Sequence, residues 1–240
     1  MKVTLINGTN RKGSTYNIAH MILNKLSKEI TLETTEFFLP KDFSKACTGC
    51  FNCILKDKSL CPHSKELDPL RDSMVKADLI IITSPVYCMD VSGQLKSFLD
   101  HFGYMWLSHR PEEAMFNKIG LSVVTAAGAG LKHTSKTIKM SFNWWGVKRY
   151  FRFAKLVMAS SFEDISEKRL KQIDKDATKL SRQIAKALVK KDKLKATLST
   201  RLFFRMFRFL KKIHPEWNEV DTKYWYDVGY MDGKKPWIVK

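Results

Sequence analysis

The sequence lacks several features that would place it in specialised classes. It has no apolar run of about 18 residues, the length that a transmembrane helix needs. The N-terminal residues 1–8 enter a strand-like run at once, without the hydrophobic segment and small-residue cleavage site of a signal peptide. Internal repeats and low-complexity tracts are also missing. We therefore expect a globular, cytoplasmic protein, in which clustered cysteines bind metal or do redox chemistry more often than they form structural disulfides.

Acidic residues are scarce relative to basic ones. The 240 residues include 42 Lys and Arg against 24 Asp and Glu, a net charge of +18. Between Lys186 and Lys212, ten basic residues face one acid, Asp192, so this segment carries half of the excess. The remainder of the chain is only mildly basic. No helix-turn-helix or RNA-binding motif accompanies the charge, and we therefore expect no nucleic-acid partner.

Short apolar runs alternate with helical periodicities along the first 190 residues. Strands are expected at 2–7, within 31–38, at 78–83, at 118–124 and within 148–159, with helices from 15, around 66–76, at 92–102, at 132–145 and across 173–188. Such alternation implies βαβ crossovers and a parallel sheet. Five strands fit the flavodoxin-like doubly wound α/β order 2-1-3-4-5. We predict this domain over 1–190 and a basic, aromatic-rich helical extension over 191–240.

The loop after the first predicted strand favours a phosphate group. It reads Gly-Thr-Asn-Arg-Lys-Gly-Ser-Thr from residue 8 to residue 15 and leads into a helix N-terminus. Free backbone N–H groups and the helix dipole attract anions there, and the hydroxyls add donors. The loop lacks both the G-x-G-x-x-G of dinucleotide folds and the Gly-Lys-Ser/Thr ending of a P-loop. A bound NAD fold and an ATPase are therefore disfavoured, although an ordinary polar turn stays an alternative.

Two further loops follow the third and fourth predicted strands. The first is Thr-Ser-Pro-Val-Tyr-Cys-Met-Asp at 83–90, with Leu-Lys and Leu-Asp on the next helix at 95–100. The other is the small-residue segment Thr-Ala-Ala-Gly-Ala-Gly at 125–130, which permits close approach of a flat ring. In this order the three loops resemble those of the NADPH-dependent FMN reductase family, and the resemblance spans about residues 1–160.

The resemblance implies which residues hold FMN. Those for the phosphate are Thr9, Arg11, Lys12, Gly13, Ser14 and Thr15; those for the ribityl chain and ring are Pro85, Val86, Tyr87, Cys88 and Met89; those that close the pyrimidine end are Thr125, Ala126, Ala127, Gly128, Ala129 and Gly130. The flavin accepts hydride and the protein supplies position and electrostatics, so we assign no catalytic side chain.

Four of the five cysteines lie in one loop between the second and third predicted strands. Cys47, Cys50, Cys53 and Cys61 have the spacing C-x2-C-x2-C-x7-C, which resembles the motif of iron–sulfur flavoproteins. Closely spaced thiolates can converge on one [4Fe–4S] cluster. Zinc also accepts four thiolates, and reduced structural thiols or a redox disulfide are further alternatives.

The extension offers spare apolar surface. A helix over 198–213 would place Leu202, Met206, Phe209 and Ile213 on one stripe beside a stripe of Arg and Lys. Six aromatic residues follow between Trp217 and Trp237. We expect the apolar stripe to be buried against the protein's own body or a second subunit, in a homodimer that helps to enclose the flavin. A membrane surface is the less favoured partner.

The leading expectation is an FMN-dependent NAD(P)H oxidoreductase that passes hydride or electrons to a small acceptor. The alternative is an iron–sulfur flavoprotein electron carrier, supplied by a ferredoxin-like donor. A flavin-binding module without redox activity is a third interpretation. The choice between NADH and NADPH and the identity of the acceptor are not encoded in any motif of the sequence.

Overall fold

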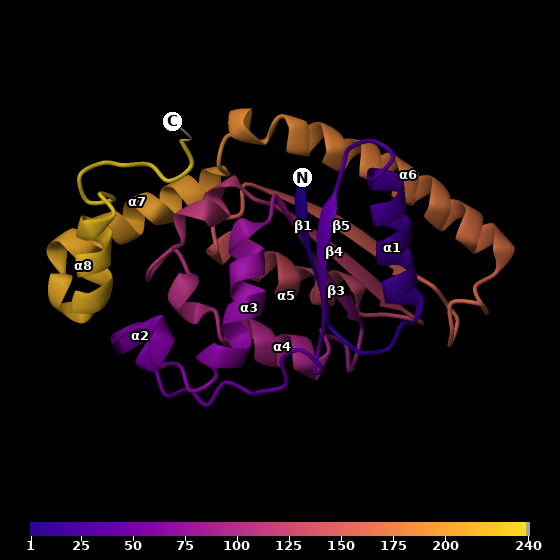
Figure 1. The fold of residues 1–240 in the computed structure, drawn as a ribbon, viewed down its shortest axis with the longest axis horizontal. Coiled ribbons are helices and arrows are strands. Elements are labelled where there is room, and N and C mark those ends of the chain that lie inside the picture. Colours follow the sequence, from indigo (N-terminus) through magenta and orange to yellow (C-terminus); the bar gives the residue numbers. More distant parts are fainter. Residues whose placement is uncertain (239–240) are drawn as a thin grey trace.

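The protein is built on one five-stranded parallel sheet, described here over residues 1–238 of a computed structural model (Figure 1). The strands are β1 (Lys2–Asn7), β2 (Glu33–Phe38), β3 (Leu79–Pro85), β4 (Ile119–Ala126) and β5 (Arg149–Leu156). Their spatial order is β2-β1-β3-β4-β5, with every neighbouring pair parallel. This confirms the predicted flavodoxin-like α/β fold.

Helices cover both faces of the sheet, as Figure 1 shows. Helices α1 (Ser14–Leu26) and α6 (Glu167–Val189) pack on one face. On the other face lie α3 (Ser64–Lys76), α4 (Gly93–Asp100) and α5 (Leu131–Trp144). The short elements are α2 (Asn52–Leu55), η1 (Lys58–Leu60), η2 (Gly103–Met105), η3 (Glu113–Asn117), η4 (Lys191–Lys193) and η5 (Pro215–Trp217).

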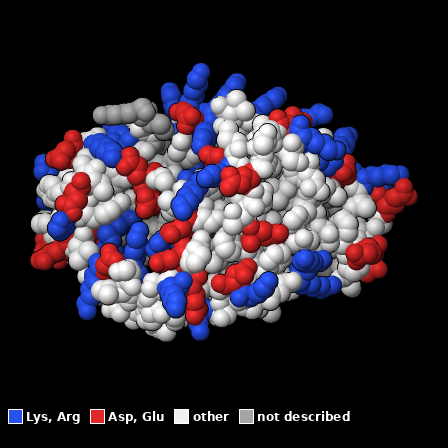
Figure 2. Space-filling model, viewed as in Figure 1, with Lys and Arg blue, Asp and Glu red and all other residues white. Residues whose placement is uncertain are grey.

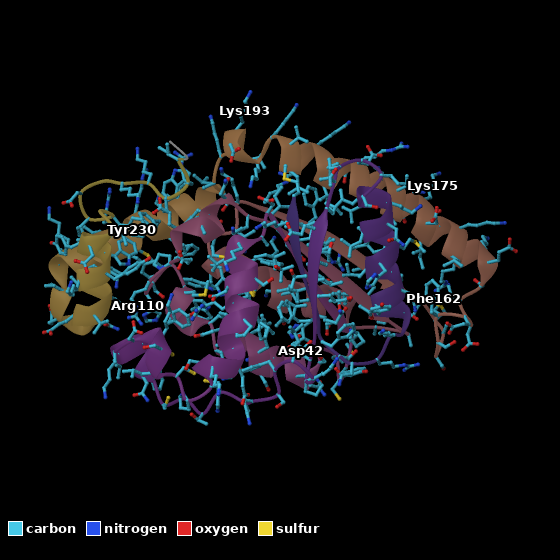
Figure 3. All side chains as sticks on the ribbon, viewed as in Figure 1. Asp42, Arg110, Phe162, Lys175, Lys193 and Tyr230 are labelled. Carbon is cyan, nitrogen blue, oxygen red and sulfur yellow. The ribbon has the colours of Figure 1, made fainter. Side chains whose placement is uncertain are left out.

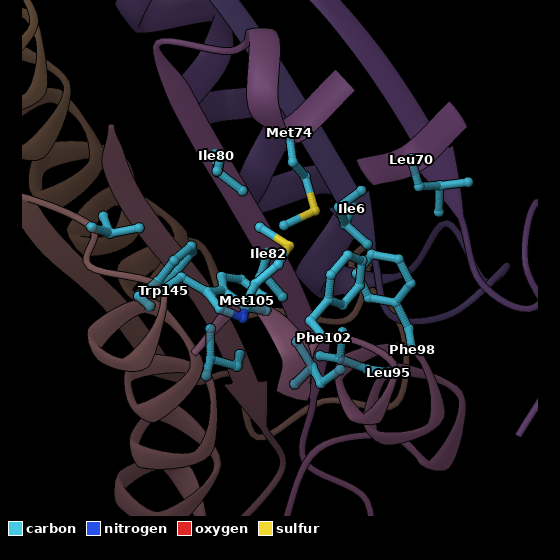
Figure 4. Packing of buried hydrophobic residues seen from close by; sticks show 14 of the residues in the cluster. Ile6, Leu70, Met74, Ile80, Ile82, Leu95, Phe98, Phe102, Met105 and Trp145 are labelled. Carbon is cyan, nitrogen blue, oxygen red and sulfur yellow. The ribbon is translucent and has the colours of Figure 1, made fainter. Parts of the chain in front are cut away.

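The central strands are buried on both sides because their side chains are apolar on both faces. Residues of β3 and β4 are buried almost throughout, as a parallel sheet covered by two helical layers requires. Figure 4 shows the α3–α5 side, where Met74, Ile82, Phe102 and Trp145 pack together. This packing fixes the sheet, and with it the edge at which the strands end.

The C-terminal extension packs on the body through a small aromatic core. It contains α7 (Leu198–Ile213) and α8 (Glu219–Asp227). Phe204, Trp225 and Tyr230 from the extension join Leu107 and Phe116 from the body, and all five are fully buried or nearly so. The ring centroids of Phe204 and Trp225 lie 4.7 Å apart. Most of the predicted extension thus shares a core with the first domain; residues 239–240 lie outside the described part.

The face of α7 that meets the body differs from the expected one. Thr200 and Phe204 are buried, whereas Leu202, Met206, Phe209 and Ile213 stay exposed on the single chain. The expectation that this stripe packs against the chain's own body is wrong, because the body offers a pocket for Phe204 instead. Whether a second subunit covers the stripe stays a prediction. Over the described residues, no helix has the length and apolarity to cross a bilayer.

Basic side chains gather unevenly on the surface. In Figure 2, Lys and Arg project along the edge formed by α6 and the start of α7, whereas both signs of charge intermix over the body. Lys193, labelled in Figure 3, points away from the fold at this edge. The arrangement agrees with the charge excess of the 186–212 segment.

Two phenylalanines of α7 test the orientation of this helix. Phe204 is 1% exposed and Phe209 is 60% exposed. We expect Phe204→Ala to lower the free energy of unfolding by about 3 kcal/mol, because it empties an aromatic core. Phe209→Ala should change it by less than about 0.5 kcal/mol. Urea unfolding followed by tryptophan fluorescence measures both changes, and a larger loss in Phe209→Ala than in Phe204→Ala would mean that the helix buries its other face.

Candidate functional site

A hollow of about 320 Å³ opens at the carboxyl ends of the strands, where β1 and β3 lead to opposite sides of the sheet. Open α/β sheets bind ligands at such switch points. The three predicted loops meet here, each directly after a strand. Side chains from β1, β3 and β4 form its floor, and the N-terminus of α1 forms one wall.

The floor is held by an amide that links three strands. Asn7, at the end of β1, donates from Nδ2 to Glu36 Oε1 at 2.7 Å and accepts from Thr83 Oγ1 at 3.2 Å. The next residue, Gly8, donates its N–H to the Thr83 carbonyl at 3.0 Å. A Cβ at Gly8 would lie 2.6 Å from the same oxygen, so only glycine permits this approach.

The polar end of the hollow is formed by the first loop. No side chain caps the N-terminus of α1, and its first turn contains no acid, so its N–H groups and dipole favour an anion. Thr15 Oγ1 lies 2.5 Å from Thr125 Oγ1, which ties this loop to the third one. Arg11 Nη2 donates to the Ser160 carbonyl at 2.6 Å and closes the rim.

The second loop contains a strained turn. Tyr87 and Asp90 exchange both backbone hydrogen bonds, at 2.9 and 3.0 Å, across Cys88 and Met89. Both central residues have positive φ, 47° and 69°, a conformation that favours Asn and Gly. Val86 donates its N–H to the Thr125 carbonyl at 2.8 Å, so the turn is anchored beside the third loop.

Most residues expected to hold FMN line the hollow, and six do not. Those that line it are Thr9, Arg11, Gly13, Ser14, Thr15, Pro85, Val86, Tyr87, Thr125, Ala126 and Ala127. Those outside the lining are Lys12, Cys88, Met89, Gly128, Ala129 and Gly130. Lys12 Nζ instead lies 5.5 Å from the Tyr16 ring centroid, a cation–π distance. Contact of each residue with a flavin stays a prediction.

Sequence reasoning missed six residues of the lining. They are Asn7, Tyr16, Thr83, Val157, Ala159 and Ser160. Asn7 and Thr83 are the last residues of their strands in the β1–β3 register. Val157 to Ser160 follow β5, whose carboxyl end lies at the same edge of a parallel sheet. The strand boundaries could have indicated all of these except Tyr16, which depends on the facing of α1.

The four clustered cysteines are all free thiols in the folded loop. Cys47 and Cys50 are exposed, whereas Cys53 and Cys61 are half-buried. Burial is the largest cause that raises the pKa of the Cys53 thiol, followed by the neighbouring thiols of Cys61, Cys47 and Cys50. The other three thiols thus lie within electrostatic reach of Cys53, and four thiolates are the donor set that a [4Fe–4S] cluster takes.

Two histidines adjoin this thiol group. The ligand atoms of Cys61, His63 and His101 lie within 4.8 Å of one another. His63 Nδ1 lies 2.9 Å from His101 Nε2, and His101 Nδ1 lies 2.8 Å from the Ser97 carbonyl. Burial holds the pKa of His101 below its usual value. His63 is half-buried, and neither it nor His101 was predicted from the sequence as a member of this group.

The strained turn yields a stability prediction. We expect the double variant Cys88→Asn, Met89→Gly to raise the free energy of unfolding of the flavin-free protein by about 1 kcal/mol, because Asn-Gly adopts positive φ at lower cost. Met140→Gly, on the exposed side of α5, is the control and should lower it by about 1 kcal/mol. Urea titration measures both changes. A loss of stability in the double variant would contradict the assigned turn.

Comparison with curated proteins finds relatives named iron-sulfur flavoproteins. One from Archaeoglobus fulgidus is 32% identical over 133 residues, which cover 54% of this chain and 56% of the relative. Another, from Methanosarcina thermophila, is 29% identical over 144 residues, covering 60% and 72% of the two chains. The chain thus aligns with little more than half of the Archaeoglobus protein.

Solved structures share the fold at low sequence identity. A flavone reductase superposes with a TM-score of 0.62 at 17% identity, covering 82% of this chain and 66% of its own. An azoreductase from Bacillus anthracis has a TM-score of 0.59 at 13% identity, with 76% and 99% covered. At these identities the likeness shows the fold alone.

Residues 1–164 match the family described as NADPH-dependent FMN reductase. Because that match covers well over half of the sequence, this chain belongs to the NADPH-dependent FMN reductase family.

Proposed function

We propose that the protein is an FMN-dependent NAD(P)H oxidoreductase. The observation that carries the proposal is the single hollow at the β1–β3 switch point, with a helix N-terminus and Arg11 at one end and apolar side chains at the other. This polarity suits a molecule with an anionic phosphate and a flat, largely apolar ring. When bound, FMN supplies the hydride and electron chemistry.

The chain's own residues position the cofactor and limit its surroundings. Arg11, Ser14 and Thr15 would bind the phosphate, since they combine a fixed cation, hydroxyl donors and the start of α1. Val86 and Ala126 line the apolar part beside Tyr87, which is 43% exposed. Among the described residues, neither a carboxylate nor an imidazole lines the hollow. The site is therefore equipped for redox chemistry on a bound flavin and not for general acid–base catalysis by side chains.

The role of Arg11 can be tested by comparing two flavins. Arg11→Ala should weaken FMN binding about tenfold or more, because it removes a charge-assisted contact to the phosphate. Riboflavin, which has no phosphate, should bind with nearly unchanged affinity. Lys12→Ala is the matched control: its ammonium lies over the Tyr16 ring and Lys12 does not line the hollow, so a smaller effect is expected. Quenching of flavin fluorescence measures the affinities. Equal losses of affinity for FMN and riboflavin would contradict the assignment of Arg11 to the phosphate.

A second candidate function is that of an iron–sulfur flavoprotein electron carrier. The three thiols of Cys47, Cys50 and Cys61 within electrostatic reach of Cys53 favour it, since a [4Fe–4S] cluster needs four thiolate ligands. The names of the Archaeoglobus and Methanosarcina relatives support the same proposal. A cluster here would give the flavin an electron route to a protein partner such as a ferredoxin-like donor. In its absence, the flavin would react directly with a small acceptor.

Iron and sulfide analysis separates the two functions. Protein purified without oxygen should contain about four irons and four sulfides per chain if the cluster is present. Cys50→Ser should lower both contents strongly. Cys88→Ser, which alters the remaining cysteine outside the thiol group, should leave them unchanged. If the unaltered protein contains no iron and NADPH or NADH bleaches its bound flavin, the result would support an oxidoreductase without a cluster.

Partners of the protein stay predictions. We propose a homodimer, for which the exposed stripe of α7 offers apolar surface on the single chain. A small-molecule acceptor fits a flavin site that is open at the sheet edge. A membrane surface stays the alternative partner for α7, whose exposed stripe adjoins Arg205 and Lys212.

A further inference from the structure

A buried carboxylate connects the C-terminal extension to the body. Asp221, in the first turn of α8, is 1% exposed. Its Oδ2 lies 2.6 Å from His109 Nδ1, and its Oδ1 accepts from Arg110 Nη1 at 2.6 Å. Lys211 Nζ of α7 lies 3.7 Å from Oδ2. Burying a carboxylate is costly unless it is paired and hydrogen-bonded, and these partners satisfy that condition.

Arg110 extends this pairing to the cysteine loop. Its Nη1 donates to the Ile54 carbonyl at 2.9 Å, and its Nη2 donates to the carbonyl of Cys53. Asn218, the N-cap of α8, donates from Nδ2 to the same Ile54 carbonyl at 3.2 Å. Both carbonyls belong to α2, the short turn that carries Cys53. Figure 3 shows Arg110 between α8 and α2.

The segment that carries Arg110 is itself held by α8. Trp225 Nε1 donates to the His109 carbonyl at 2.6 Å, and Tyr224 Oη donates to the Pro111 carbonyl at 2.9 Å. The arginine therefore has a fixed backbone on one side and a fixed carboxylate on the other. A planar guanidinium is suited to bridge a carboxylate and two carbonyls, because its donors lie on separate nitrogens, here Nη1 and Nη2, whereas the donors of a lysine all lie on one.

A packing role alone explains the aromatic rings, but it does not explain these polar contacts. Arg110 is 10% exposed at its side chain and directs donors to both a cysteine's carbonyl and the extension's carboxylate. Beyond α2, the cysteine loop has little regular structure of its own: residues 43–51 form neither helix nor strand. External contacts must therefore supply the rigidity that a set of four thiols needs.

We propose that Asp221 is a positioning residue for the cysteine loop, acting through Arg110, so that the C-terminal extension completes the thiol site. The proposal rests on the second candidate function in one respect, that the thiols hold a cluster. Asp221 orients the guanidinium, the guanidinium holds the carbonyls of Cys53 and Ile54, and Cys53 is thereby kept beside its three partners. A test of this positioning role needs one measurement that is independent of iron.

Hydrogen exchange of the flavin-bound, metal-free protein provides that measurement. In Asp221→Asn, the amides of 53–56 should exchange about tenfold faster than in the unaltered protein, because a charged bridge that restrains α2 is lost. Arg110→Lys should have the same effect and serves as the test if Asp221→Asn fails to fold. Asp221→Glu, which restores the charge, should recover part of the protection. Asp227→Asn, at an exposed ion pair with Lys223, should change nothing.

Two further readouts separate positioning from general stability. Iron retained after anaerobic reconstitution should fall to less than about half in Asp221→Asn, whereas FMN affinity should stay unchanged, because neither Asp221 nor Arg110 lines the hollow. Tyr224→Phe loosens α8 without removing the carboxylate and should keep its iron. If Tyr224→Phe lost as much iron as Asp221→Asn, the effect of Asp221 would be explained by packing of α8 alone.

The failure of this inference is distinguishable from failure of the cluster proposal. Absence of iron from the unaltered protein would refute the cluster proposal. The exchange rates of α2 would still test the connection from Asp221 to the loop. Wild-type exchange rates in both Asp221→Asn and Arg110→Lys would overturn the inference, whatever the iron content.

Discussion

The parallel pairing of β1 with β3 is the constraint on which the rest of the site depends. It is completed by the hydrogen bond from Gly8 N–H to the Thr83 carbonyl and by the Asn7 amide, which links three strands. Because the connections after these strands lead to opposite faces, their loops part and leave the hollow between them. The start of α1 then brings its N–H groups and dipole to one end of that hollow.

The extension adds a second level of organisation. Its aromatic core with Leu107 and Phe116 lies away from the flavin hollow, yet α8 contacts the turn that carries Cys53. The exposed stripe on α7 and the buried face around Phe204 therefore serve different ends. One face attaches the extension to the body, and the other, exposed on the single chain, is the surface that we propose for a second subunit. The extension thus contacts the cysteine loop through α8 and carries, on α7, the exposed apolar stripe that we propose for a homodimer.

Much of the site could be predicted because it lies where regular elements end. The glycine-, serine- and threonine-rich loop at 8–15 and the small-residue loop at 125–130 follow buried strands, so parallel topology alone brings them to one edge. Lys12 was expected at the phosphate, and Cys88 and Met89 beside the ring, but all three lie outside the lining. The side chain of Lys12 lies over Tyr16, and Cys88 and Met89 adopt positive φ in the turn at 87–90. The direction of such a side chain depends on the residues that it contacts in the fold, and the hydrophobic pattern of the sequence does not reveal those contacts.

The sequence by itself determined the strand order, the three loops of the hollow and the grouping of four cysteines, because each follows from local pattern and short spacing. Only the tertiary structure decided which face of α7 is buried, that His101 lies beside Cys61, and that Asp221 reaches Arg110. Those contacts join residues up to 111 positions apart, as the Arg110–Asp221 pair shows. Such pairs depend on how separate elements dock, and docking is governed by the fit of whole surfaces, which no short stretch of sequence encodes.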